Sequence, residues 1–172
     1  MPIFGVVDHC TGELLGIHAS KQGTRFEALE PVRQAVRSSF GGFQAAIVSG
    51  LKLRHDRGSG SRSKATGRTW KRPIAGGTQY TSDAFQREIR WLGIESSPSF
   101  IRAPEGNGVI ERFWRTLKEQ LLWIRTFHTV EELRLALHAF KDHYNHRWLI
   151  ERHGHRTPAQ VRADLTGHIT AA

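Results

Sequence analysis

Hydrophobic residues recur at helical spacing between residues 107 and 123. They fall on one side of the helix that this spacing predicts, and polar residues occupy the other side. The apolar stripe consists of Ile110, Phe113, Trp114, Leu117 and Leu121. The opposite face carries Glu111, Arg115 and Lys118. Such a face has an ordinary interpretation, a solvated surface with an i,i+4 ion pair, unless other residues point to chemistry there.

Similar patterns predict the other elements. We expect a β-hairpin of residues 3–7 and 13–19 with a turn at 8–12. We also expect a helix over residues 26–40 that ends at Gly41, and Pro31 must either lie near its first turn or kink it. A second helix runs from Ser82 to Trp91, followed by a short extended segment at 94–97. Thr129 with Glu132, and Thr157 with Gln160, are capping boxes that begin two further helices. The first of these buries Val130, Leu133, Leu137, Phe140 and Tyr144.

A β-favouring run precedes the first candidate for chemistry. Ala46, Ile47, Val48, Leu51 and Leu53 lead to His55 and Asp56, after which Arg57-Gly58-Ser59 breaks the pattern. We interpret this run as a buried strand that carries Asp56 at the carboxyl edge of a sheet, where open α/β folds place their sites.

Several stretches together resemble the catalytic core of the DDE transposases and retroviral-type integrases, especially the insertion-sequence transposases. They are HDRGS, QYTSDAFQ, LGIESSPS, NGVIERF, TLKE and the tail YNHRWLIERHGHRTPAQV. In that family the second acid lies in D-x-G-S and the third in N-x-x-x-E, with 35 residues between them. Here 54 residues separate Asp56 from Glu111, and leaving out residues 60–78 removes 19 of them and restores 35.

The segment 60–78 differs from its surroundings in composition. It contains five basic residues, no acid and four glycines, which is typical of a loop or disorder. A basic loop in which Trp70 stacks on a base is one interpretation, and an insertion that simply loops out is the other. We favour the insertion, and divide the chain into an incomplete catalytic core at 1–165, containing this loop, and a tail at 166–172.

The resemblance implies an α/β fold of the RNase H-like type, a mixed central sheet flanked by helices, with its first strand absent. It also implies DNA transposition or integration by metal-dependent polynucleotidyl transfer. Asp56 and Glu111 would be catalytic and would bind Mg²⁺ or Mn²⁺, with two metal ions in the intact enzyme. Asn107, Arg115 and Lys118 would contact DNA, the last two through phosphates. A homo-oligomer on transposon ends and target DNA is the implied assembly.

Asp8 is the one earlier aspartate that could serve as the family's first acid. We assign it instead to the hairpin turn, because Asp8 followed by Thr11-Gly12 suits an Asx-type turn. The first catalytic acid is then absent from these residues, and we expect the chain by itself to be catalytically impaired.

Composition limits the kinds of protein that this chain could be. The net charge of +9 and pI near 10.6 favour a polyanionic partner, but weakly. One cysteine rules out a disulfide framework, no apolar run could span a bilayer, and we expect a cytoplasmic location.

A non-enzymatic DNA-binding remnant of a transposase is the main alternative. A nuclease sharing the RNase H-like fold and metals is disfavoured by the N-x-x-x-E and QYTS stretches. A metal module on the histidines (His138, His143, His146, His153 and His155) lacks zinc-ligand spacing.

Overall fold

The computed structural model describes residues 1–55, 78–98 and 108–170. Its helices are α1 (Arg25–Phe40), α2 (Thr78–Thr81), α3 (Asp83–Trp91), α4 (Gly108–Leu117), α5 (Val130–Arg147) and α6 (Pro158–Thr170), with a π-helical turn η2 (Lys118–Leu122) and a 3-10 turn η3 (Glu151–His153). The strands are β1 (Ile3–Val7), β2 (Leu14–Ala19), β3 (Lys52–His55) and β4 (Glu95–Pro98). In the described residues, no helix is long and apolar enough to cross a membrane.

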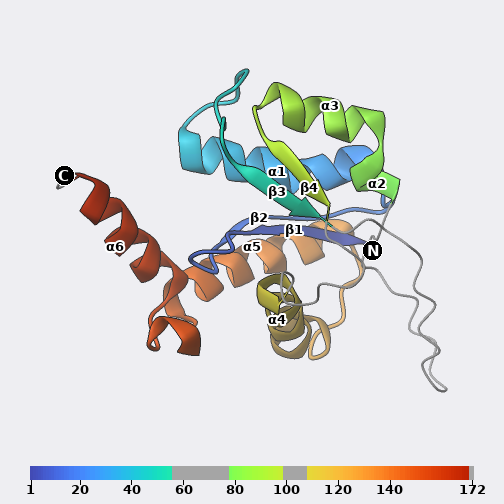
Figure 1. Cartoon of the computed structure of the whole chain (residues 1–172). Coiled ribbons are helices and arrows are strands. Elements are labelled where there is room, and N and C mark those ends of the chain that lie inside the picture. Colours follow the sequence, from blue (N-terminus) through green and yellow to red (C-terminus); the bar gives the residue numbers. More distant parts are fainter. Residues whose placement is uncertain (56–77, 99–107, 171–172) are drawn as a thin grey trace.

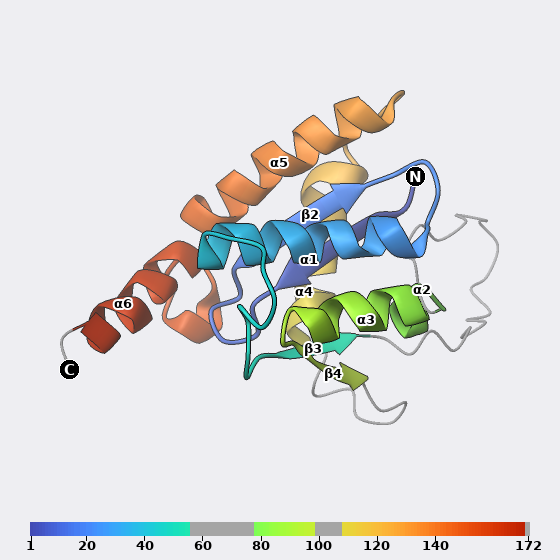
Figure 2. The same cartoon turned by 90° about the horizontal axis from the view of Figure 1, so that it is seen from above.

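The strands form two ladders among the described residues. β1 pairs with β2 antiparallel, with an irregularity between Val6 and Val7, and β3 pairs with β4 parallel. Figure 1 shows α1 and α3 on one side of the strands and α4 and α5 on the other. Figure 2, seen from above, shows α6 extending away from this layered body. The expected mixed α/β architecture is confirmed. Among the described residues, the strands form two separate two-stranded ladders, because β1 and β3 are not hydrogen-bonded to each other.

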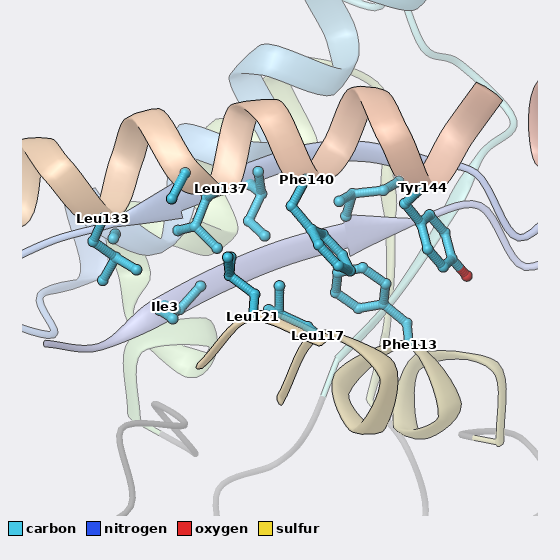
Figure 3. Packing of buried hydrophobic residues seen from close by; sticks show 12 residues of the cluster. Ile3, Phe113, Leu117, Leu121, Leu133, Leu137, Phe140 and Tyr144 are labelled. Carbon is cyan, nitrogen blue, oxygen red and sulfur yellow. The ribbon is translucent and has the colours of Figure 1, made fainter. Parts of the chain in front are cut away.

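Two hydrophobic clusters lie on the two faces of β1. Ile3 joins a cluster with Phe113, Leu117, Leu137 and the other buried residues of α4 and α5, and Figure 3 shows these side chains meeting between α5, the hairpin and α4. Phe4 points the other way, into a cluster from α1, α3 and the turn before β3. β1 is therefore covered on both faces, as an interior strand is.

The expected helix boundaries hold because the expected caps form. Ser82 and Thr129 each accept a hydrogen bond from the first turn of α3 and α5, respectively. Thr24, which the sequence analysis did not single out, caps α1 in the same way. The capping box at α6 is also present, since Thr157 N–H donates to Gln160 Oε1 and Gln160 N–H donates to Thr157 Oγ1. Pro31 lies beyond the first turn of α1, and the helix continues through it to Phe40.

The strand before Asp56 differs from the prediction. Only Lys52–His55 is a strand, and of its four residues only His55 is buried. Residues 46–51 instead make tight turns, in which Ser49 N–H donates to Ala46 C=O and Leu51 N–H to Val48 C=O. Ala46 and Gly50 have positive φ angles of 56° and 90°, which an extended strand does not contain. The apolar residues here serve a turn that packs on α3, so a strand-like composition was misleading.

The hairpin turn confirms the structural role of Asp8. Its carboxylate accepts hydrogen bonds from the N–H groups of Cys10 and Thr11 and from the Thr11 hydroxyl, the last at 2.6 Å. An aspartate that caps its own turn in this way is accounted for by the turn.

Candidate functional site

A groove of about 850 Å³ lies between the two ladders. It runs between β1 and β3, with apolar residues of α1 along it and the polar face of α4 on one wall. Its lining includes Gly5, Val7, Val32, Leu53, His55, Glu111, Trp114, Arg115 and Lys118. The end of β3 and the middle of α4, which are far apart in the sequence, therefore line the same groove.

The polar face of α4 forms as its periodicity predicts. Phe113 and Leu117 are fully buried, Leu121 nearly so, and Ile110 and Trp114 pack against the same cluster. Burial of this stripe leaves the opposite residues, Glu111 and Arg115, exposed. The helix ends in the π-helical turn η2, which no pattern in the sequence predicted.

Glu111 is a carboxylate that no cation neutralises among the described residues. Arg115, one turn further along α4, makes no ion pair with it, and neither does Lys118. The ordinary interpretation, an i,i+4 ion pair on a solvated helix, is therefore not what this part of the chain forms. A solvent-facing carboxylate beside two cations can bind a hard cation and leave the basic groups to bind phosphates.

His55 fixes the end of β3, immediately before Asp56. Its side chain is 7% exposed, and its Nε2 lies 2.9 Å from Ser96 Oγ on the neighbouring strand. The imidazole stacks on Tyr80, with ring centroids 5.6 Å apart, and meets the edge of Phe85 at 6.2 Å. Sequence reasoning treated His55 only as the residue before Asp56, whereas here it anchors the point from which Asp56 departs. The signal in the sequence was that His55 ends the predicted buried strand, a position at which a histidine needs a hydrogen-bond partner.

Of the five residues proposed from the sequence, three are described. Glu111, Arg115 and Lys118 all line the groove. Asp56 and Asn107 lie outside the described residues. Among the described residues, no three His, Cys, Asp or Glu side chains gather as a metal ion would require, and the histidines of the C-terminal half make no such cluster.

The chain is similar to an integrase core domain and to a transposase. A family model described as an integrase core domain matches residues 92–158, a span that includes Glu111. The transposase for insertion sequence element IS904 of Lactococcus lactis subsp. lactis (strain IL1403) is 34% identical over 68 residues, which are 40% of this chain and 27% of that protein. The chain therefore spans about a quarter of that curated relative.

Solved structures agree on the fold. The catalytic core domain of BIV integrase superposes with a TM-score of 0.63 at 20% identity, over 99% of this chain and 90% of that one. A chain of the simian T-cell lymphotropic virus intasome in complex with PP2A regulatory subunit B56 gamma matches with a TM-score of 0.50 at 17% identity, over 94% and 54%. At these identities the likeness shows the architecture, which is the RNase H-like fold of integrase cores. Residues 92–158 are thus similar to an integrase core domain, part of the chain is similar to a transposase, and the fold is that of integrase catalytic cores.

Proposed function

We propose that the groove is the DNA-facing surface of a transposase-type polynucleotidyl transfer site. In it, Glu111 and Asp56 bind a divalent cation, and Arg115 and Lys118 hold DNA phosphates. The observation that carries this proposal is the convergence on one groove of Glu111, the two cations and His55, the residue before Asp56. Mg²⁺ and Mn²⁺ suit the site because hard cations prefer carboxylate oxygens.

Of the two proposed metal ligands, the described one, Glu111, suits a divalent cation. Glu111 is exposed and unneutralised within the described chain, so its oxygens are available to a cation. When bound, such ions would supply activation of the attacking oxygen and stabilisation of the leaving one in phosphodiester chemistry. The protein's own contribution is to hold Glu111 rigidly, through the buried Phe113 and Leu117 on the other side of α4, and to fix the start of the Asp56 segment through His55.

These 172 residues by themselves carry two of the three acids of a DDE site, since Asp8 is committed to its turn. We therefore propose that they bind a cation weakly and turn over DNA little or not at all. A non-enzymatic DNA-binding role is the second candidate, and the net charge of +9 favours it as much as it favours the first. In either case the partner is DNA, and the oligomeric state in complex with transposon ends stays a prediction.

Metal titration of the purified chain tests the first proposal. We expect Mg²⁺ or Mn²⁺ to bind, and Glu111→Gln and Asp56→Asn each to weaken binding roughly a hundredfold, because losing even an outer partner of a metal site costs about 10–100-fold. Calorimetry gives the affinity, and Mn²⁺-induced NMR line broadening locates the ion. The matched control is Glu119→Gln, the same change of charge two turns along on the same groove wall.

Unchanged affinity in Glu111→Gln would remove Glu111 from the site. Absence of any binding in the wild type, together with intact DNA binding, would leave the DNA-binding remnant as the function.

The salt dependence of DNA binding tests the roles of Arg115 and Lys118. We expect Arg115→Ala and Lys118→Ala each to weaken binding similarly for all sequences. Each should also reduce the slope of log affinity against log salt by about one, because each phosphate contact releases condensed counterions. Fluorescence anisotropy of labelled duplexes at several salt concentrations measures both quantities.

Arg90→Ala is the control for loss of a cation. Arg90 is exposed on α3 and does not line the groove. An equal loss of affinity and slope in Arg90→Ala would show that the basic charge acts diffusely and that the groove is not the DNA-binding surface.

A further inference from the structure

Trp123 is the most exposed of the tryptophans that the structure describes, and it lines the groove. Its side chain is 70% exposed. The other three described tryptophans, Trp91, Trp114 and Trp148, each have an aromatic ring of the protein within 6.4 Å, measured between ring centroids. Among the described residues, no aromatic ring or cation stacks on Trp123. Packing within the chain therefore accounts for the other three indoles and leaves both faces of this one open.

The π-helical turn η2 determines the direction of the Trp123 side chain. Trp123 N–H donates to Lys118 C=O at 2.9 Å, an i→i+5 bond that closes one turn with an extra residue. In an unbroken α-helix, with about 100° per residue, residue 122 would lie on the face of Glu111 and residue 123 would be rotated about 120° away. The extra residue moves Trp123 into the place of residue 122. Trp123 therefore lines the groove, while Leu122 packs against the cluster of α4 and α5.

The helix face that Trp123 extends carries two cations. Arg115 and Lys118 lie between Glu111 and Trp123 in the sequence and line the same groove. With about 1.5 Å per residue, and with Trp123 in the place of residue 122, the indole lies about 16 Å along the helix from Glu111. A stacked DNA strand advances about 3.4 Å per nucleotide, so this wall spans about five nucleotides. One strand along the wall would thus meet the two cations with its phosphates and Trp123 with a base.

We propose that Trp123 stacks on an unpaired base of a DNA strand whose phosphates Arg115 and Lys118 hold. This inference rests on the proposed DNA-binding function of the groove and names the form of DNA that the groove takes. The strand is unpaired about five nucleotides from the point nearest Glu111. The bases of a duplex are covered by their stacked neighbours, whereas an unpaired base offers an open π-face to an indole ring. A basic groove with an aromatic ring along it binds single strands with little regard to sequence.

The charges around Trp123 favour DNA over a second copy of this chain. Ile124 beside it is 69% exposed, so the two side chains together would also suit a protein contact. The groove wall next to Trp123, however, carries Arg115, Lys118 and Glu119. The centre of a protein–protein interface is depleted in charged residues, whereas phosphates require cations.

Fluorescence anisotropy of the full chain with labelled DNA tests the proposal. The probes are a thymidine strand of about twelve nucleotides, a blunt duplex of the same length, and that duplex with a single-stranded extension of about six nucleotides. Trp123→Leu should weaken binding of the single strand and of the extended duplex by about 5- to 150-fold, the loss of one base–aromatic stack, and leave the blunt duplex unchanged. Trp123→Phe keeps a ring and should retain most of the affinity.

The matched control is Trp91→Leu, the same substitution at an exposed tryptophan of α3 that does not line the groove. It should leave binding of all three probes unchanged. The slope of log affinity against log salt should be the same in Trp123→Leu as in the wild type, because no charge is lost. Circular dichroism checks that each variant is folded.

Photocrosslinking reads the contact directly. A strand with 5-iodouracil in place of one thymine at a time is irradiated in complex with the chain, since this base crosslinks to an aromatic ring stacked on it. Mass spectrometry of the digested complex should find the adduct on Trp123.

The proposal is wrong if Trp123→Leu binds the single strand as tightly as the wild type, or if it loses as much affinity for the blunt duplex. If Arg115→Ala then still lowers the salt slope, the groove remains a DNA-binding surface and only the stacking is excluded. If Arg115→Ala does not lower it, the proposed function of the groove fails as well. A monomer–dimer equilibrium in sedimentation that Trp123→Leu abolishes in the absence of DNA would assign Trp123 to a contact between copies and overturn the proposal.

Discussion

Replacing Gly16 with alanine should destabilise the protein by about 3 kcal/mol or more. Gly16 lies on β2 where α1 crosses it, and a Cβ placed there would lie 2.1 Å from the Pro31 carbonyl oxygen and 2.8 Å from its carbon. Overpacking usually costs about 1–3 kcal/mol, and this contact falls at the upper end because a helix backbone cannot rotate away as a side chain can. Chemical denaturation followed by circular dichroism measures the loss.

Gly108→Ala is the matched control. Gly108 begins α4, and a Cβ there would meet none of the described residues within 4 Å, so stability should be unchanged or slightly raised. If Gly16→Ala unfolds at a denaturant concentration close to that of the wild type, α1 does not lie against β2 at this distance. The groove, which α1 lines, would then have a different shape.

Removing the amide of Asn145 should cost about 2–4 kcal/mol. Asn145 is buried on α5, where its Oδ1 accepts from Leu14 N–H at 2.9 Å and its Nδ2 donates to Leu14 C=O at 3.0 Å. Its side chain thus extends the sheet by satisfying the outer edge of β2 where the strand ladder stops. Asn145→Ala would leave both peptide groups of the fully buried Leu14 without a partner, and each such group costs about 1–3 kcal/mol.

Asp142→Ala serves as the control on the same helix. Asp142 is exposed and, within the part of the chain that the structure describes, pairs only with His146 across one turn. Its loss should therefore change stability by less than about 0.5 kcal/mol. Thermal unfolding by calorimetry compares the two variants. Equal stability of Asn145→Ala and the wild type would mean that water reaches the Leu14 peptide groups.

The two stability predictions concern opposite sides of the same hairpin. α1 presses on β2 at Gly16, and α5 holds its outer edge through Asn145. Together they fix β1, which forms one side of the groove, while α4 forms another. The position of Glu111 therefore depends on contacts that contain none of the proposed catalytic residues. Variants that lose metal or DNA binding should first be checked for an intact hairpin.

Local signals in the sequence determined most of the secondary structure. The hairpin, α1, α3, α5 and the start of α6 follow from periodicity and from the caps Ser82, Thr129 and Thr157, because caps and apolar stripes act over one or two turns. The exposed face of α4 followed in the same way, since burial of Phe113 and Leu117 leaves Glu111 on the outside. The family resemblance was also readable, because it depends on short motifs.

The tertiary structure decided what local patterns cannot contain. Residues 46–51 have the composition of a strand, but they turn, because α3 packs against them and Gly50 has a positive φ. The anchoring of His55 by Ser96, Tyr80 and Phe85 joins segments more than twenty residues apart, and no periodicity reports such a contact. The groove lies between β1 and β3 because the two ladders are not hydrogen-bonded to each other among the described residues. Which distant strands pair depends on packing across the whole molecule, so local sequence patterns do not predict it.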